Sequence, residues 1–326
     1  MKKLEYREAI REAIIEEMDR DSRVFLIGED IGVYGNIFRT YKDLLNKYGP
    51  GRVINTPISE ATITGAGIGA ALTGYRPVVE IMYVDFTALA MDQIVNQAAK
   101  IRYMTGDELN VPLVIRTQGG SGNGVAAQHS QSLEAWFYHI PGLKVVCPAT
   151  PYDVKGLLKT AIRDDNPVIF IEHKMIYQQK GDVPDEEYTI PFGLAEIKKE
   201  GKDITVVTYS QMLFKALSAA EKLEGEGISC EIIDLRTLVP LDLDTIIKSV
   251  RKTNHLVIIT EAYERGSIAS DISAKVNREA FDHLDAPVEI IAGFNTPIPF
   301  NSTLERASIP QIEDIIKKIK NIINLI

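Results

Sequence analysis

Short apolar runs alternate with segments of helical spacing from residue 6 to residue 175. A first helix is predicted over 6–18, because apolar side chains recur at positions 6, 9, 10, 13 and 14. The apolar runs are short enough to be buried strands, whereas the segments between them are longer and more polar. The predicted strands are 24–27, 77–81, 111–116, 144–147 and 168–172, and the predicted helices between them are 41–47, 86–103 and 151–163. This alternation predicts βαβ units and a parallel sheet covered by helices.

The sequence changes character between residues 177 and 191, where it becomes polar and contains Gly181 and Pro184. We therefore predict a domain boundary there, with a first domain over 1–185 and a second over 192–326. A second alternation follows, with strands over 204–208, 230–235, 256–260 and 288–291 and helices over 212–223, 244–251, 268–281 and 311–323. The predicted fold class is α/β, with two doubly wound parallel-sheet domains.

The stretch from Asn55 to Leu72 combines one acidic residue with a long uncharged segment. Residues 61–72 contain no charged side chain, which predicts a helix that is buried on every side. Each glycine at 65, 67 and 69 costs a helix roughly 1 kcal/mol relative to alanine, so we expect something to approach this backbone closely. Glu60 would start the helix, where a buried carboxyl group can share a proton with a ligand nitrogen. A simple preference for acids at helix N-termini explains Glu60 equally well from this stretch alone.

Composition and charge narrow the class of protein. The hydrophobic content of 45% and charged content of 25% are those of a soluble globular protein. A net charge of -9 leaves no basic stripe for nucleic acid, and no apolar run reaches the roughly 18 residues of a membrane span. The N-terminal lysines are not followed by an apolar core, so we expect no signal peptide. Cys147 and Cys230 lie in apolar runs and are expected in the core. We expect a cytoplasmic protein.

Residues 65–70 match the dinucleotide-binding pattern G-x-G-x-x-A, with Glu80 and Asp85 where a ribose-binding acid would fall. That pattern requires a strand that runs directly into the first glycine, and here residues 57–62 intervene. The missing strand disfavours nicotinamide or flavin binding at these residues. A nicotinamide-dependent oxidoreductase that acts alone is therefore only a disfavoured alternative in a different class. The sequence has neither a G-x-x-x-x-G-K-[ST] phosphate loop nor a G-x-S-x-G nucleophile motif.

Two further residues lie in contexts that suit a ligand site. None of the five histidines has a second histidine or a cysteine at metal-ligand spacing, but His129 follows the glycine-rich segment 119–124 and has polar neighbours. A histidine in such a loop can act in acid–base chemistry, or it can simply be a surface residue. Phe86 comes just after a predicted strand, where α/β sheets bind ligands, although an ordinary core position is the favoured explanation for Phe86 taken alone.

Eight motifs taken together resemble a known family. The chain is similar to the β subunit of the thiamine-diphosphate-dependent first component of 2-oxoacid dehydrogenase complexes, a group that includes pyruvate, branched-chain 2-oxoacid and acetoin dehydrogenases. The motifs are Ile58-Ser-Glu60, Gly65-Ala-Gly-Ile-Gly-Ala-Ala, Asp92-Gln-Ile-Val-Asn-Gln-Ala-Ala-Lys100, Ala126-Ala-Gln-His-Ser-Gln131, Pro141-Gly-Leu-Lys-Val-Val, Thr150-Pro-Tyr-Asp-Val-Lys-Gly-Leu-Leu, Ala161-Ile-Arg-Asp-Asp-Asn-Pro167 and Asp234-Leu-Arg-Thr-Leu-Val-Pro-Leu-Asp242. Residues 100–104, 146–153, 172–174 and 181–193 most resemble acetoin-type subunits.

The resemblance implies a transketolase-like pyrimidine-binding domain followed by a transketolase C-terminal domain. It also implies roles for individual residues. Glu60 would hydrogen-bond N1′ of the cofactor's aminopyrimidine, and Phe86 would pack on that ring with Ile58 and Met82 as apolar lining. His129 would stabilise intermediates or assist acyl transfer to a lipoyl group. Some members bind a structural potassium ion, and the matching positions are Leu113, Ala161, Ile162, Asp164 and Asn166.

One family feature is missing from this chain. Mg²⁺ and the cofactor's diphosphate are held by a G-D-G…N-N motif in the family, and the two G-D pairs here, at 106–107 and 181–182, lack it. The resemblance therefore implies an α subunit that holds Mg²⁺ and shares the thiamine diphosphate in an α2β2 heterotetramer. A lipoyl acyltransferase and a flavin dehydrogenase would be further partners.

The predicted reaction is oxidative cleavage of acetoin with transfer of the acetyl group to lipoyl. Decarboxylation of pyruvate or a branched-chain 2-oxoacid is the alternative within the family. A non-catalytic scaffold subunit is a further possibility outside it.

Overall fold

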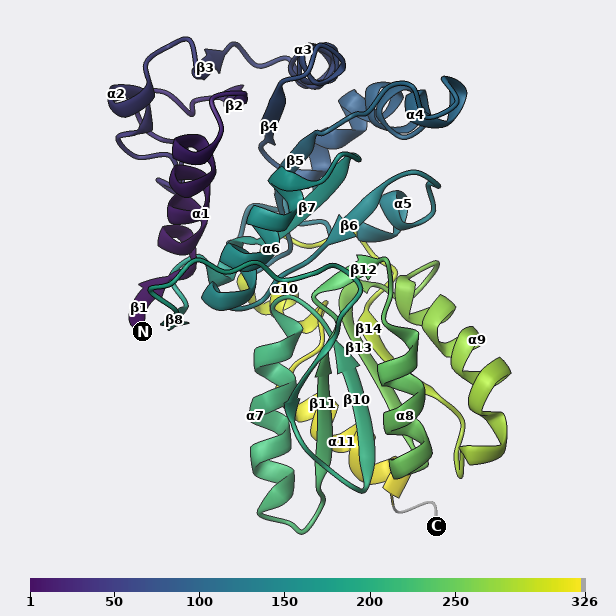
Figure 1. Ribbon diagram of the computed structural model, residues 1–326. Helices are drawn as coiled ribbons and strands as arrows, with labels where there is room; N and C mark the ends of the chain where they lie inside the picture. The colour runs from purple at the N-terminus through teal and green to yellow at the C-terminus, as the bar shows by residue number, and fades with distance from the viewer. Residues whose placement is uncertain (324–326) are drawn as a thin grey trace. The chain divides into compact units, whose positions relative to one another are not determined.

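The computed structural model describes residues 1–323, which form two compact units (Figure 1). The first unit contains residues 1–119 and 136–192, and the second contains residues 120–135 together with the chain from residue 193 onward. The segment 120–135 lies inside the first predicted domain in the sequence, whereas in the structure it packs with the second unit.

The first unit is built on a parallel sheet. Its strands are arranged in the order β6-β7-β5-β4-β2-β3, and every neighbouring pair is parallel. The neighbouring strands β5 and β7 are buried along their whole length, which explains why the sequence shows continuous apolar runs rather than alternation. The bounds are β2 (Val24–Glu29), β3 (Val53–Thr56), β4 (Arg76–Ile81), β5 (Val114–Gly119), β6 (Lys144–Val146) and β7 (Val168–His173).

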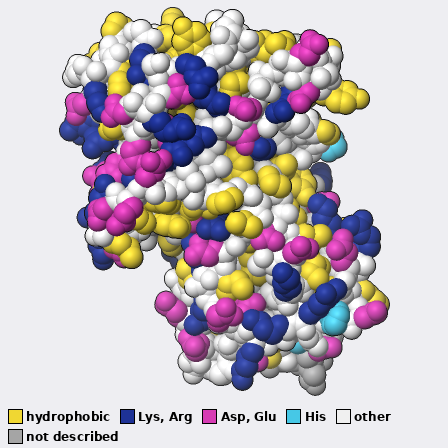
Figure 2. All heavy atoms as spheres, in the orientation of Figure 1, with side chains coloured by type: hydrophobic (Ala, Val, Ile, Leu, Met, Phe, Trp, Pro, Cys, Tyr) yellow, Lys and Arg dark blue, Asp and Glu magenta, His cyan; other side chains and the backbone are white. Residues whose placement is uncertain are grey.

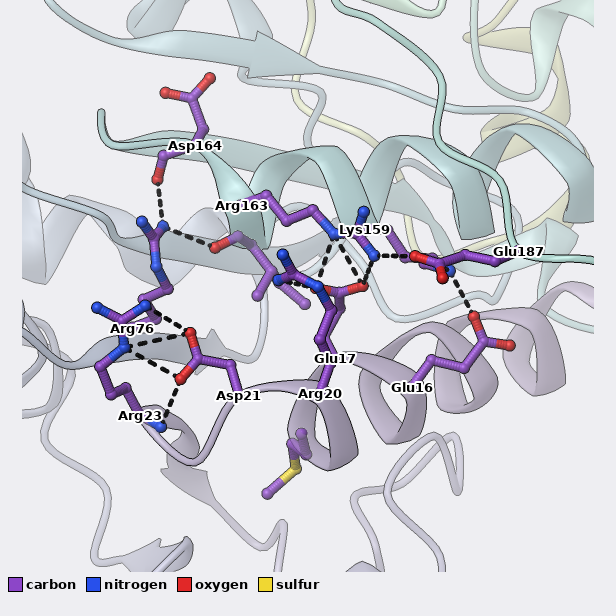
Figure 3. Close-up of polar contacts among 12 residues, drawn as sticks. Glu16, Glu17, Arg20, Asp21, Arg23, Arg76, Lys159, Arg163, Asp164 and Glu187 are labelled. Carbon is purple, nitrogen blue, oxygen red and sulfur yellow. Dashed lines mark hydrogen bonds and ion pairs between the residues drawn. The ribbon is translucent and has the colours of Figure 1, made fainter.

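Helices α1 (Tyr6–Arg20) and α6 (Pro151–Arg163) pack against each other and are joined by partly buried ion pairs (Figure 3). The Lys159 ammonium lies 2.6 Å from Glu16, and the Arg163 guanidinium lies 2.6 Å from Glu17, whose side chain is almost fully buried. The bounds of α6 agree with the predicted helix. Shorter elements complete the unit: β1 (Lys2–Glu5) and β8 (Lys180–Val183), which pair antiparallel, and α2 (Leu44–Tyr48), α3 (Glu60–Leu72), α4 (Ile101–Met104) and η3 (Lys174–Ile176). Helix α5 (Glu134–Tyr138) begins in the segment 120–135, and its residues from 136 onward belong to the first unit.

The single helix predicted over 86–103 is wrong. The chain there forms a 3₁₀ helix, η1 (Val84–Ala90), a π-helical segment, η2 (Gln93–Ala98), and the short α4. Burial of Val84, Ala90, Ile94 and Ala98 produced the helix-like apolar spacing. Such spacing shows which positions face the core, but it does not separate i→i+3 from i→i+5 hydrogen bonding.

A buried charge network crosses the middle of the first unit's sheet. Arg116 on β5 is fully buried, and its guanidinium contacts Glu172 on β7 at 2.6 Å and Glu80 on β4 at 2.9 Å. The hydroxyl groups of Tyr41 and Tyr177 donate to the same two carboxylates. Removing one partner of such a network leaves an uncompensated buried charge, which costs about 3–5 kcal/mol. Glu80, considered above as a ribose-binding acid, is thus engaged within the protein.

The second unit has a sheet in the order β14-β13-β10-β11-β9, in which only the edge strand β9 is antiparallel to its neighbour. Two helix pairs cover this sheet, α7 with α11 and α8 with α9. The strands are β9 (Glu196–Lys199), β10 (Ile204–Thr208), β11 (Cys230–Asp234), β13 (Leu256–Tyr263) and β14 (Glu289–Gly293), with β12 (Thr237–Val239) as a further short strand. The helices are α7 (Met212–Glu224), α8 (Leu243–Thr253), α9 (Ile268–Ala280), η4 (Phe281–His283), α10 (Ser302–Ala307) and α11 (Ile312–Ile323).

The predicted α/β class with parallel-dominated sheets is confirmed in both units. Cys147 and Cys230 are both buried in the core, as predicted. Across residues 1–323, no helix is long and apolar enough to cross a bilayer. Figure 2 shows acidic and basic side chains intermingled on the face it presents, without a continuous basic stripe.

Candidate functional site

Glu60 begins α3 at the carboxyl end of the first unit's parallel strands. Strand β3 ends at Thr56, a short link follows, and the Glu60 side chain is held in an environment where the residue is only 7% exposed. Thr56 is the register partner of Glu29, the last residue of β2. The carboxyl edge of an open α/β sheet is the usual place for a ligand. Glu60 thus combines three features of a functional acid: burial, a helix N-terminus and the ligand-binding edge of the sheet.

Glu29 is a second carboxyl group at this edge. Partial burial raises the pKa of Glu29, and the negative charges of Glu60 and Asp30 raise it further. The effect of Glu60 on this pKa places the two carboxyl groups in one electrostatic neighbourhood. Sequence reasoning missed Glu29 as a site residue. Its position as the final residue of a strand that ends beside the Glu60 region was the available signal.

The packing of helix α3 requires glycine at only one of its three glycine positions. A Cβ atom on Gly67 would lie 2.5 Å from Cγ2 of Val79, so the close approach expected from the sequence is that of strand β4. Gly65 would meet only a Gln93 side-chain carbon at 3.8 Å, and Gly69 faces open space. The prediction that this helix is buried on every side is wrong for the chain by itself, because Thr62, Ala66 and Gly69 are exposed. Small, uncharged residues therefore form an open face.

Met82 and Phe86 follow the end of β4 in the same unit. A cis peptide bond joins Met82 to Tyr83, and both Met82 and Phe86 are half-buried. Phe86 belongs to η1, which contacts α3, so the structure brings the segment of Phe86 to the helix that Glu60 begins. Ile58 lies in the link before α3 and is 74% exposed. These residues offer an acid, an aromatic ring and accessible apolar side chains, which fit a heteroaromatic ring with a basic nitrogen.

His129 lies in the segment 120–135, which packs with the second unit. Its imidazole is half-buried, and its backbone amide donates to the carbonyl oxygen of Ala126, a residue with a φ of 64°. Two buried carboxylates of the second unit bind this segment: Glu261 accepts from the amide of Ser121 at 2.6 Å, and Glu305 accepts from the amide of Gly122 at 2.7 Å. His129 is therefore carried by a loop with a defined, hydrogen-bonded conformation.

Glu134, at the end of the same segment, is almost fully buried. Burial raises the pKa of Glu134 to about 7, and the neighbouring charge of Glu261 contributes in the same direction. Its Oε2 atom is buried without a hydrogen-bond partner. A neutral carboxyl group tolerates this environment better than a carboxylate does.

Oxygen atoms of the five residues expected at a potassium site are engaged in hydrogen bonds within the first unit. The carbonyl oxygens of Ile162 and Asp164 each accept from the Arg76 guanidinium at 3.0 Å (Figure 3). The carbonyl oxygens of Leu113 and Ala161 accept backbone amides, and the Asn166 side-chain oxygen accepts from Arg102. Each carbonyl oxygen has a second lone pair, so these hydrogen bonds do not by themselves prevent the oxygen from binding a cation. Within residues 1–323, no cluster of His, Cys, Asp and Glu suits a multivalent metal.

Comparison with known proteins identifies the family. The sequence-family model of the transketolase pyrimidine-binding domain matches residues 2–180, and that of the transketolase C-terminal domain matches residues 193–315. The chain is 50% identical over 324 residues to the β subunit of acetoin:2,6-dichlorophenolindophenol oxidoreductase from Cupriavidus necator, covering 96% of both chains. The chain belongs to the family of 2-oxoacid and acetoin dehydrogenase E1 β subunits.

Pyruvate dehydrogenase subunits are similarly close relatives. The chain is 48% identical over 316 residues to the E1 component subunit β from Rickettsia felis, covering 97% of both chains. It is 47% identical over 323 residues to the mitochondrial E1 subunit β-1 from Oryza sativa, covering 98% of this chain and 86% of that protein. A solved structure described as a split gene transketolase, inactive β4 tetramer, has the same fold, with a TM-score of 0.81 at 24% identity and 98% coverage of both chains.

The family resemblance and the transketolase-like fold are thus confirmed. Family membership implies dependence on thiamine diphosphate. The dinucleotide pattern at residues 65–70 lies inside α3 rather than in a loop before a helix, so it does not form a phosphate-binding turn.

Proposed function

We propose that this chain is the β half of a thiamine-diphosphate enzyme that cleaves acetoin oxidatively and passes the acetyl group to a lipoyl-bearing acyltransferase. The observation that carries the proposal is Glu60, a buried carboxyl group at the N-terminus of α3, beside the segment that bears Phe86. Bound thiamine diphosphate supplies a nucleophilic carbon and an electron sink for cleavage next to a carbonyl group.

The chain's own residues hold the pyrimidine half of that cofactor. Glu60 binds N1′ and transfers a proton there, which changes the protonation state of the ring. Phe86 packs on the ring face, and Met82 and Ile58 complete an apolar lining that excludes water. His129 acts in a later step, as a donor to an intermediate or to the departing acyl group.

An α subunit completes the site in an α2β2 heterotetramer and holds Mg²⁺ with the diphosphate. The absence of a G-D-G…N-N motif supports this division. The open face of α3 and the 74% exposure of Ile58 also support it, since apolar and small residues beside a site call for a covering surface. The acyltransferase and a flavin dehydrogenase are the further partners in this proposal.

A potassium ion bound by Leu113, Ala161, Ile162, Asp164 and Asn166 is part of the proposal. Its support is the pair of carbonyl oxygens, from Ile162 and Asp164, that both lie 3.0 Å from one nitrogen of the Arg76 guanidinium. The chain should melt at a higher temperature in potassium chloride than in sodium chloride at equal ionic strength. Equal melting temperatures would remove this ion.

The substrate is tested with the chain reconstituted with its α subunit. Acetoin, pyruvate and branched-chain 2-oxoacids are compared by kcat/KM with a lipoyl acceptor, and we expect acetoin to have the highest value. Support for acetoin comes from the residues resembling acetoin-type subunits and from the 50% identity to an acetoin enzyme. A higher value for pyruvate or a branched-chain acid would select the alternative within the family, and no turnover of any substrate would indicate a non-catalytic subunit.

A further inference from the structure

The backbone of the glycine-rich loop between β5 and α5 forms neither a helix nor a strand, so regular secondary structure does not supply hydrogen-bond partners for its N–H groups. Gly120, Gly122 and Gly124 have φ values of 84°, 112° and 66°, which lie in the left-handed region. A chain that turns in this way points successive N–H groups towards one side and forms a concave binding site for anionic oxygens. Each buried amide of the loop must therefore find an acceptor.

Two carboxylates supply these acceptors. Glu261, at the end of β13, accepts the amide of Ser121 at 2.6 Å and its hydroxyl group at 3.0 Å. Glu305, on α10, accepts the amide of Gly122 at 2.7 Å and the amide of Gly124 at 3.0 Å. Hydrogen bonds to an ionised acceptor are about twice as strong as bonds between neutral groups.

Both glutamates require this contact because they are buried. Glu261 is 9% exposed and Glu305 is 3% exposed, and a carboxylate removed from water requires donors directed at its oxygens. The loop amides provide those donors for Glu305 on both of its oxygen atoms. The interaction is therefore reciprocal, since the glutamates order the loop and the loop stabilises the buried charge.

A further hydrogen bond connects this anchor to His129. The amide of Gly120 donates to the carbonyl oxygen of Gln131 at 2.9 Å and closes a loop of chain that contains both the anchored amides and His129. Inside it, the amide of His129 donates to Ala126 at 3.3 Å. With its two ends joined and residues 121–124 fixed, the remaining part of the loop has few conformations left to lose.

We propose that Glu261 and Glu305 are positioning residues that hold the glycine-rich loop, and through it the His129 imidazole, in the reactive arrangement. The inference rests on the proposed role of His129. Neither glutamate touches substrate in this account, and both act through the backbone amides of residues 121–124.

The first test measures the loop without any catalytic assay. In Glu305→Gln, one of the two acceptor oxygens becomes an NH₂ group that faces a backbone N–H. The remaining oxygen is no longer charged, and the amides of Gly122 and Gly124 must share it. We expect hydrogen–deuterium exchange of the peptide covering residues 120–131 to accelerate about tenfold or more in the full chain, the scale of losing a hydrogen bond to a charged group. Glu313→Gln, an exposed acid in the first turn of α11, is the control and should leave that exchange unchanged.

The second test locates the catalytic consequence in the complex reconstituted with the α subunit. Glu305→Gln should lower kcat for acyl transfer to lipoyl about tenfold while leaving proton exchange at C2 of the bound cofactor unchanged. His129→Ala should impair the same step without loosening the loop, and the double variant should be no slower than His129→Ala alone. A purely structural role for Glu305 would instead slow both steps together.

The outcomes separate the two proposals. Unchanged hydrogen exchange in Glu305→Gln overturns the positioning role, whatever the kinetics show. Accelerated exchange together with an unaffected His129→Ala enzyme overturns the role of His129 and leaves the anchoring of the loop standing. Should Glu305→Gln fail to fold, Ser121→Ala removes only the hydroxyl contact with Glu261, and the same peptide should then exchange about two- to fivefold faster; no change would again overturn the proposal.

Discussion

Individual carboxyl groups in this protein take different roles because their surroundings differ. Glu305 and Glu261 are buried as acceptors of backbone amides, whereas Glu80 and Glu172 are buried around Arg116. Glu134 has neither kind of partner on its Oε2 atom. Burial disfavours the charged form of a carboxyl group, and this is the main reason why the pKa of Glu134 rises to about 7.

The first residue-scale prediction concerns the pH dependence of stability. In the folded chain the Glu134 carboxyl group has a pKa of about 7, whereas the ordinary pKa of a glutamate is 4.5. Between these pH values the folded state therefore binds more protons than the unfolded state. Stability should therefore fall as the pH rises through this window, by about 3 kcal/mol in total, and stay level above it.

The comparison of wild type with Glu134→Gln isolates this effect. Thermal melting at about pH 5 and about pH 8 should show the variant gaining stability relative to the wild type at the higher pH. The same difference between the two proteins at both pH values would contradict a raised pKa for Glu134. Glu313→Gln serves as the exposed-acid control and should follow the wild type.

At the scale of elements, α3 shows how one helix can require glycine at one position and tolerate it at another. Gly67 faces Val79 on β4, and the added Cβ atom would lie 2.5 Å from it. Gly69, two residues later, faces open space. The same substitution should therefore have opposite effects at the two positions.

Gly67→Ala should destabilise the protein by about 1–3 kcal/mol, because it forces atoms into a packed helix–sheet contact. Gly69→Ala should stabilise it by about 0.5–1 kcal/mol, because alanine favours the helix and meets no neighbour. Chemical denaturation of the two variants and the wild type tests both signs. Equal effects at the two positions would contradict the packing of α3 on β4.

Elements whose signals are local could be predicted from the sequence. The helix over 151–163 agrees with α6, because Thr150 caps it and Pro151 fits its first turn. The strand over 204–208 agrees with β10. The helix over 86–103 could not be resolved into η1, η2 and α4, because apolar spacing does not specify the hydrogen-bonding pattern.

Part of the candidate site could also be predicted from the sequence. The position of Glu60 at the start of α3 follows from the sequence around it. The anchoring of the His129 loop does not, because Ser121 and Glu261 are 140 residues apart and Gly122 and Glu305 are 183 residues apart. Contacts over such separations depend on the folded arrangement, and a single sequence carries no direct signal for them.

At the scale of the whole molecule, the chain is one half of a shared site in our proposal. It belongs to a family of thiamine-diphosphate enzymes, yet it lacks the motif that holds the metal and the diphosphate. This chain then binds the pyrimidine end of the cofactor, with Glu60 as the proton-transferring group. The α subunit holds the metal and the diphosphate.

Proton exchange at C2 of thiamine diphosphate, bound to the reconstituted α/β enzyme, tests this central claim most directly. Glu60→Gln keeps the size of the side chain but removes the transferable proton, so the exchange rate should fall by roughly 10²–10⁴-fold, the usual contribution of acid–base catalysis. Cofactor binding should persist, and Glu313→Gln should exchange like the wild type. Exchange at the wild-type rate in Glu60→Gln, with cofactor bound, would contradict the role of Glu60.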